Sequence, residues 1–209
     1  MIDLFNEERA NKTANLFMYL TSKQCPAWAK DSMRDVLMVV IIMLRGEATR
    51  AFLKKMWTGK TPLTTRLQKL LENGVIKATN GKWSNENSYY VDESLVENGI
   101  YNLTFPRENL YIFSNAVMNL PRYLEGINSY NEIALILESA LKVNKGTGLA
   151  TLNKRTIQSV GCLKGGSSSA LCIRNALVKK GILRCITKAT ATREPQFALN
   201  KKAYLLGAK

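Results

Sequence analysis

A pattern of apolar, charged and glycine positions occurs twice along the chain. It covers residues 70–78 (LLENGVIKA) and residues 177–185 (LVKKGILRC). Both stretches run leucine, apolar, charged, polar or charged, glycine, apolar, apolar, basic, with identical spacing. The repetition indicates that the chain contains two copies of one structural unit.

Each stretch is typical of a helix that ends at a glycine and is followed by a strand. Leu63, Leu67 and Leu70 recur at the spacing that places side chains on one face of a helix. Gly74 follows the last apolar turn, where a residue in the left-handed conformation commonly ends a helix. The next residues are β-branched and suit extended backbone. Gly181 holds the same place in the second copy.

The flanking residues predict the remaining elements of both units. In the first unit we expect helices over residues 32–46, 47–57 and 62–73, the last with Thr61 as N-cap and Pro62 as its first residue. A hairpin follows over residues 77–93, with its turn at residues 80–81 or 84–88. In the second unit we expect helices over residues 130–143 and 149–160. A third helix there is capped by residues 167–169, and a hairpin follows over residues 184–200.

The length suits two small domains joined by ordered chain. Residues 1–30 are predicted to be a helical extension, with an amphipathic helix over residues 4–22. Residues 31–105 form the first domain, residues 106–128 a helical connector bounded by Pro106 and Pro121, and residues 129–209 the second domain. The N-terminus is acidic, which argues against a secretory signal. The longest apolar run, residues 36–44, is far shorter than the roughly 20 residues that cross a bilayer. We expect it to be buried in the domain or in a subunit interface, in a soluble cytoplasmic protein without a membrane partner.

The residue types give little support for catalysis or metal binding. The chain has no histidine, so neither a Ser-His-Asp nor a Cys-His site can form. Residues 59–61 (GKT) are similar to the end of a phosphate-binding loop, but Lys54 stands where that motif requires glycine. No two cysteines have the spacing of a zinc site, and free thiols in a reducing compartment are expected for Cys25, Cys162, Cys172 and Cys185. We expect no enzyme activity, no cofactor and no metal.

Basic residues outnumber acidic ones and concentrate in the second copy. The chain has 30 Lys and Arg against 16 Asp and Glu, a net charge of +14 and a pI near 9.7. Residues 1–100 carry 14 basic and 11 acidic side chains, whereas residues 142–209 carry 14 basic side chains and one acidic, Glu194. Such an excess is typical of proteins that bind nucleic acids. A basic face kept for solubility is the alternative, although solubility rarely demands so one-sided a distribution.

The third helix of the first unit offers a polar face opposite its leucines. A major groove about 12 Å wide admits one α-helix, so a helix that contacts bases must bury one face and expose the other. The helical count puts five polar side chains on or beside the exposed face: Thr64, Thr65, Arg66, Gln68 and Lys69. Near the tip of the hairpin, Lys82 can meet a phosphate, and Trp83 is expected to pack beneath the hairpin.

The second unit departs from this pattern where Arg174 takes the place of Leu67. Ile173 assumes the apolar role one residue earlier, so either the helix is rotated or the Arg174 side chain reaches out to solvent. The outward residues on the same count are Ser168, Cys172, Asn175 and Lys179. Lys164 and two glycines precede this helix, and the free N–H groups at its start suit a phosphate contact. A turn that needs glycine only for its geometry is the alternative.

Residues 61–78 (TPLTTRLQKLLENGVIKA) and 167–185 (SSSALCIRNALVKKGILRC), each followed by a hairpin-like segment, resemble the third helix and wing of winged-helix regulators. Two linked copies are similar to plasmid replication initiators and to some phage or plasmid transcription factors. The resemblance implies a mainly α fold with small β-hairpin wings (α+β), in two tandem winged helix-turn-helix domains. It also implies sequence-specific binding of double-stranded DNA, with the third helix in the major groove. The predicted DNA-binding residues are Lys60, Thr64, Thr65, Arg66, Gln68, Lys69, Lys82, Lys164, Ser167, Ser168, Arg174, Asn175, Lys179, Lys188 and Arg193.

The function that we expect is transcriptional regulation of a plasmid or phage, in the cytoplasm and associated with the nucleoid. A replication initiator or origin-binding protein is the alternative, and a winged-helix adaptor for protein contacts is the third candidate. The expected partners are double-stranded DNA and either RNA polymerase or replication proteins. Two architectures remain open. Both units contact one DNA site, or the first unit forms a homodimer interface and only the second contacts DNA.

Overall fold

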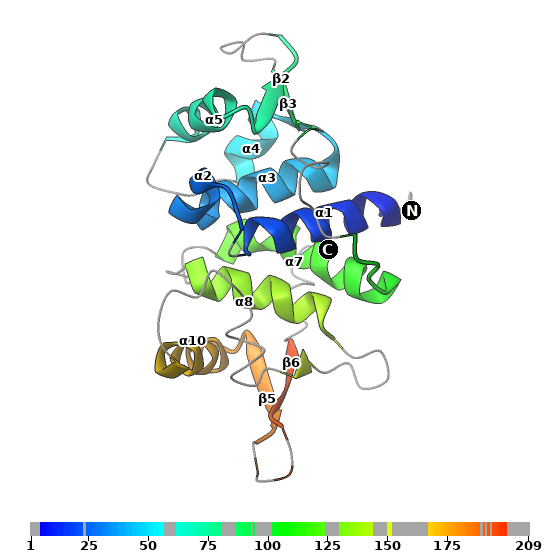
Figure 1. Cartoon of the computed structure of the whole chain (residues 1–209), viewed down its shortest axis with the longest axis vertical. Coiled ribbons are helices and arrows are strands. Elements are labelled where there is room, and N and C mark those ends of the chain that lie inside the picture. The colour runs from blue at the N-terminus through cyan, green and yellow to red at the C-terminus, as the bar shows by residue number, and fades with distance from the viewer. Residues whose placement is uncertain are drawn as a thin grey trace.

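The chain is mainly helical with two small antiparallel sheets, which agrees with the predicted α+β class (Figure 1). The computed structural model describes residues 5–22, 24–56, 62–80, 87–92, 94, 102–123, 130–143, 150–151, 167–188, 190, 192 and 194–199. None of the helices in these ranges combines the length and the apolar character needed to span a membrane.

The first three helices bury most apolar residues of the N-terminal part. α1 (Glu7–Leu20) begins at Asn6, whose side chain accepts a hydrogen bond from the backbone N–H of Arg9. A short helix, α2 (Ala27–Asp31), leads to α3 (Met33–Arg45), which Ser32 caps in the same way. Residues 36–42 are all buried, so the longest apolar run of the sequence lies in the core.

The residues predicted as the second helix divide into a strand and a shorter helix. β1 (Ala48–Thr49) pairs with β3 (Ser88–Val91), and α4 (Arg50–Met56) begins only after it. The prediction of one helix over residues 47–57 is therefore wrong at its start. The reason is tertiary, because a strand from elsewhere in the chain satisfies the backbone groups of β1.

The third helix and the hairpin of the first unit agree with the prediction. α5 (Leu63–Glu72) differs by one residue at each end, because Pro62 is the N-cap instead of the first helical residue and Asn73 is the C-cap instead of the last. Gly74 has a φ of +66°, the left-handed conformation expected after this helix. β2 (Ile76–Ala78) then pairs antiparallel with β3, which completes a sheet of order β1-β3-β2.

The predicted connector is a helix that belongs to the core. α7 (Arg107–Tyr123) runs through Pro121 instead of ending there. Its Phe113 is fully buried and packs against Phe17 of α1, with 5.7 Å between the ring centroids. α7 therefore packs against the rest of the structure, as the sequence predicts, and does not act as a flexible linker.

The second unit contains α8 (Tyr130–Leu141), β4 (Ala150–Thr151), α10 (Ser167–Lys179), β5 (Leu183–Thr187) and β6 (Gln196–Leu199). α8, α10 and the hairpin agree with the predicted elements. The helix predicted over residues 149–160 is wrong at its start, because Ala150 and Thr151 form a strand that pairs with β6. Residues 152–160 lie outside the described residues. Gly181 has a φ of +72°, matching Gly74.

The two units share their strand order and the register of the first three residue pairs of their hairpins. The sheets have the orders β1-β3-β2 and β4-β6-β5. Lys77 lies opposite Tyr90, and Arg184 lies opposite Ala198, each basic residue standing three positions after its left-handed glycine. The repeated sequence pattern therefore marks a repeated three-dimensional unit.

The two units meet through a central group of helices. α1, α3, α7 and α8 lie between the two sheets, and the buried apolar residues of both units form one continuous cluster (Figure 1). The four segments predicted as separate domains and connectors thus share a core. In Figure 1 the hairpin β2–β3 lies at the upper end and β5–β6 at the lower end, while α5 and α10 both lie to the left. The hairpins of the two units therefore point in opposite directions, while α5 and α10 lie on the same side.

Candidate nucleic-acid interface

α5 turns Leu67 and Leu70 inward and exposes Thr65 and Glu72. Leu67 and Leu70 are 3% and 0% exposed, whereas Thr65 on the opposite side is exposed. The helical count from the sequence therefore identified the buried face correctly. Thr64 and Gln68 are half-buried at the sides of the helix.

Several polar side chains of α5 are bonded within the first unit. The Thr64 hydroxyl accepts a hydrogen bond from Arg50 at 2.9 Å. Gln68 Nε2 donates to Glu72 Oε1 at 2.8 Å. Thr65 forms no side-chain bond within the described part of the chain, so it is the residue of α5 best placed to meet a ligand.

Arg66 does not lie at the edge of an exposed face, as the helical count suggested. Its side chain is 13% exposed, and Nη1 donates to Asp35 Oδ1 and, at 3.0 Å, to Ser32 Oγ. The Nζ of Lys69 lies 3.7 Å from the other oxygen of Asp35, and its side chain is 40% exposed. Because Arg66 is bound to a buried carboxylate, we assign it to the structure of the first unit and not to the DNA surface.

In the second unit, α10 exposes Cys172, Asn175 and Lys179, as the sequence predicts. Arg174 takes an intermediate position. Its guanidinium carbon lies 5.0 Å from the ring centroid of Phe197, and burial lowers its pKa, although an arginine keeps its charge at neutral pH. The side chain therefore covers an aromatic residue of the core edge and is not fully extended into solvent.

β5 carries a row of exposed side chains that the sequence analysis did not single out as a set. Arg184 and Ile186 of β5, and Lys188 directly after its end, alternate with less exposed residues, and Ile186 is 44% exposed. Cys185 pairs with Phe197 and Thr187 with the preceding residue of β6, so Ile186 is the extra residue of a β-bulge. Alternation along the first strand of the predicted hairpin was the signal that could have identified Arg184 beside the predicted Lys188.

α4 adds two cations that the sequence analysis also omitted. Lys54 and Lys55 are exposed in the last turn of this helix, and within the described ranges no acidic side chain pairs with either. Their position on the helix before α5 was the available signal, because the resemblance to helix-turn-helix proteins implies that this helix crosses the DNA backbone.

The remaining predicted residues cannot be placed on this surface. Ser167 and Ser168 belong to the first turn of α10, but their side chains are not described. The other predicted contacts outside the described residues are Lys60, Lys82, Lys164 and Arg193. Trp83, expected to pack beneath the hairpin, and Cys162, expected to be a free thiol, also lie outside the described residues.

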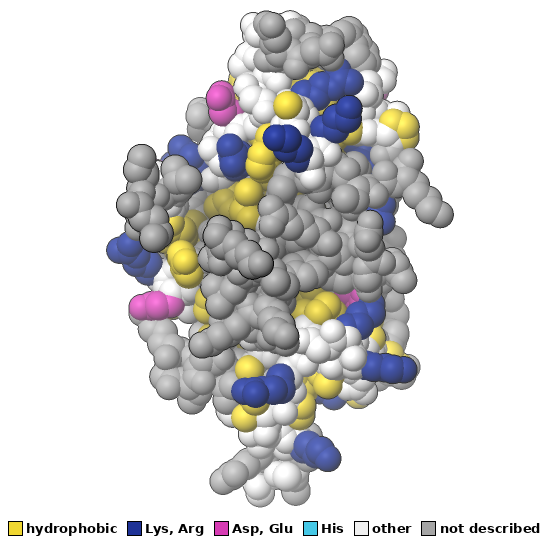
Figure 2. Space-filling model, turned by 180° about the vertical axis from the view of Figure 1, so that it is seen from behind, with side chains coloured by type: hydrophobic (Ala, Val, Ile, Leu, Met, Phe, Trp, Pro, Cys, Tyr) yellow, Lys and Arg dark blue, Asp and Glu magenta, His cyan; other side chains and the backbone are white. Residues whose placement is uncertain are grey.

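In each unit acidic groups neutralise some of the described cations, and others stay exposed. In the first unit, Lys77 lies 2.9 Å from Asp92, and the hydrogen bonds from Lys77 and then Ser94 hold the pKa of Asp92 below its usual value. In the second unit, Lys179, Arg184 and Lys188 are exposed, and no acidic side chain in the described part pairs with them. Figure 2 shows Lys and Arg side chains near both ends of one face, with few acidic side chains among the described residues.

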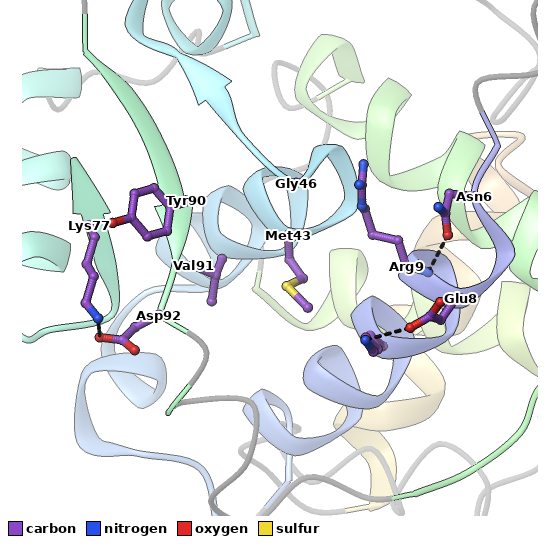
Figure 3. A pocket seen from close by; sticks show the side chains of 10 residues that line it. Asn6, Glu8, Arg9, Met43, Gly46, Lys77, Tyr90, Val91 and Asp92 are labelled. Atoms are coloured by element: carbon purple, nitrogen blue, oxygen red, sulfur yellow. Dashed lines mark hydrogen bonds and ion pairs between the residues drawn. The ribbon is translucent and has the colours of Figure 1, made fainter. Parts of the chain in front are cut away.

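A cleft of about 680 Å³ separates α1 from the outer face of the first sheet. In Figure 3, Lys77, Tyr90 and Asp92 face Arg9 and Glu8 across Met43. The charged groups of both walls are already bonded. On α1, Lys12 pairs with Glu8 at 2.7 Å and Arg9 Nη1 donates to the carbonyl of Arg45 at 2.9 Å, and on the sheet Lys77 pairs with Asp92 at 2.9 Å. The hydrogen bond and the charge of Lys12 lower the pKa of Glu8. Because these groups bind one another, the cleft offers less to a polyanion than α10 and β5.

No group of three acidic or cysteine side chains in the described ranges is arranged to hold a metal ion. Comparison with protein-family models, curated proteins and solved structures finds no match to this chain.

Proposed function

We propose that this protein binds double-stranded DNA in a sequence-specific manner and regulates transcription. The observation that carries the proposal is the surface formed by α10 and β5, where Lys179, Arg184 and Lys188 are exposed without acidic partners in the described part of the chain. Phosphate neutralisation by such side chains supplies much of the affinity of DNA-binding proteins. The one-sided charge of residues 142–209 points to the same unit.

The order of elements supports a winged-helix assignment for both units. In each unit a helix, a short strand and a solvent-facing helix are followed by a hairpin, and the first strand pairs with the last. On this proposal α5 and α10 are the recognition helices and the two hairpins are the wings. A recognition helix fits the major groove and a wing lies along the neighbouring backbone.

A binding measurement with selected DNA tests the proposal. Duplexes that the purified protein retains from a random pool are sequenced, and affinity for one of them is measured over a salt series. About five phosphate contacts would give a log–log slope of about −4 to −5. Absence of binding at low salt, or an affinity that does not respond to salt, would contradict the proposal.

The selected sequences also separate regulation from replication initiation, which is the alternative proposal. Direct repeats spaced by helical turns favour an initiator that assembles along an origin. An isolated site, with RNA polymerase or a competing repressor acting there, favours a regulator.

A second architecture, in which the first unit is a homodimer or partner interface, is favoured by one observation. Several cations of that unit are held by acidic groups, including Arg66, Lys69 and Lys77. Thr65→Ala decides between the architectures. Reduced discrimination between the selected duplex and random DNA supports a first unit that contacts bases, since a good base contact contributes about 1–3 kcal/mol. Unchanged discrimination supports an interface.

A further inference from the structure

Two buried carboxylates occupy the same position in the two units, counted from the start of the first helix. Asp35 is the third residue of α3, and Glu132 is the third residue of α8. They are 1% and 6% exposed. A carboxylate so far removed from water requires a cationic or hydrogen-bonding partner.

Each of these carboxylates binds a basic side chain from the recognition helix or the turn directly after it. Asp35 accepts a hydrogen bond from Arg66 and lies 3.7 Å from the Nζ of Lys69. Glu132 accepts from the Nζ of Lys180 with both oxygens, at 2.8 and 2.9 Å. The same position of the first helix therefore anchors the recognition helix in both units.

The attachment points on the two recognition helices differ. Arg66 stands eight residues before Gly74, in the first half of α5, whereas Lys180 stands one residue before Gly181, just beyond the end of α10. An anchor near the start of one helix and beyond the end of the other constrains the tilt and rotation of the two helices differently. Arg174, which replaces the buried Leu67, also changes the face that α10 turns to its core.

We propose that Asp35 and Glu132 are equivalent positioning residues, which set α5 and α10 against DNA in different orientations so that the protein recognises two unlike half-sites. This inference rests on the proposed DNA binding and on the architecture in which both units contact one site. Asp35 has a second effect, because its charge opposes the cations of Arg66 and Lys69. The negative charge of Asp35 weakens the non-specific attraction of the first unit to phosphates. The affinity of this unit for DNA then depends more on its contacts to bases.

The test compares Asp35→Asn and Glu132→Gln in the full chain, because both changes remove the charge and keep an oxygen that can accept a hydrogen bond. Glu138→Gln is the matched control. Glu138 is also buried on α8, but its partner Lys142, at 2.6 Å, belongs to the same helical segment and not to a recognition helix. The probes are the selected duplex, two derivatives with base substitutions in one half or the other, and a scrambled duplex of the same composition.

Asp35→Asn is expected to lower the ratio of the affinities for the selected duplex and for the derivative substituted in one half by about tenfold or more. Glu132→Gln is expected to lower the corresponding ratio for the derivative substituted in the other half. Affinity for the scrambled duplex should stay constant or rise, and the salt slope should become steeper by about one as the released lysine reaches a phosphate. Glu138→Gln should leave discrimination unchanged. A purely structural role would lower affinity for all four duplexes by the same factor.

Folding of each variant is checked by circular dichroism and thermal unfolding before DNA is added. If Glu132→Gln fails to fold, Lys180→Met takes its place, because that side chain is 34% exposed and lies beyond the end of α10. If Asp35→Asn fails to fold, Asp35→Ser takes its place, because it also removes the charge and keeps an oxygen that can accept a hydrogen bond from Arg66. Charge-preserving Asp35→Glu and Lys180→Arg should retain the discrimination of the natural protein. The inference is overturned if the natural protein discriminates and the folded variants behave like Glu138→Gln, or if they lose affinity equally for every duplex. Failure of the natural protein to bind any duplex would instead refute the proposed function.

Discussion

Arg174 lies over the ring of Phe197, with 5.0 Å between the guanidinium carbon and the ring centroid. Leu67 holds the corresponding position of the first unit, seven residues before the left-handed glycine, and is buried. The aliphatic part of Arg174 therefore covers apolar surface where the first unit uses leucine, while its charge is partly desolvated.

Arg174→Leu is expected to keep the fold and to raise the free energy of unfolding by about 1 kcal/mol, because an apolar side chain replaces a partly desolvated charge over Phe197. Chemical denaturation measures the change. Arg174→Ala is the control and should lower stability, since it removes the packing of the aliphatic part. A leucine variant less stable than the alanine variant would contradict this interpretation of the contact.

Leu70→Ala and Leu177→Ala are expected to lower the free energy of unfolding by similar amounts, about 2–5 kcal/mol each. Both leucines are 0% exposed, and both stand four residues before the left-handed glycine of their unit. Because the core is continuous, each variant should still unfold in one transition by circular dichroism and fluorescence. Two separate transitions would show that the units unfold independently. Leu71→Ala, at a half-buried position, should cost less.

On the proposed function, Arg184→Ala and Lys188→Ala are each expected to reduce the steepness of the salt dependence of DNA binding by about one, because each would remove a proposed phosphate contact. Lys77→Ala is the matched control for Arg184, since both lie three residues after the glycine and on the outer side of their hairpins. Lys77 is held by Asp92, so its loss should change the slope less. Equal effects of Arg184→Ala and Lys77→Ala would show that the ion pair does not distinguish the two units.

Gly74→Ala and Gly181→Ala are each expected to destabilise the protein by about 1–2 kcal/mol, because both glycines have positive φ and alanine is strained there. An added Cβ would meet no atom within 4 Å at either site, so the cost is conformational and not steric. Asparagine, which tolerates the left-handed region better, should cost less than alanine. Equilibrium unfolding of the four variants measures the difference, and equal stability of all four with the natural protein would refute it.

The local sequence pattern was sufficient to predict the elements whose residues contact near neighbours in the chain. The helix ending at Gly74 and the one ending at Gly181 follow from apolar spacing and from the left-handed preference of glycine, and both hairpins follow their helices as predicted. The buried side of α5 also followed from its leucines. The strands β1 and β4 did not, because two residues carry no periodicity and become a strand only when β3 or β6 pairs with them.

The sequence by itself determined that the chain contains two copies of a helix–glycine–hairpin unit and that the second copy carries most of the excess positive charge, because repetition and charge are properties of the residues alone. Only the tertiary structure decided which cations remain exposed to a ligand. Arg66 is bound by an aspartate 31 residues earlier, and Lys180 by a glutamate 48 residues earlier. Such partners become neighbours only when the helices pack. Local side-chain pairs in a helix join residues three or four positions apart, so they cannot bring together a carboxylate and a cation that are this far apart in the sequence.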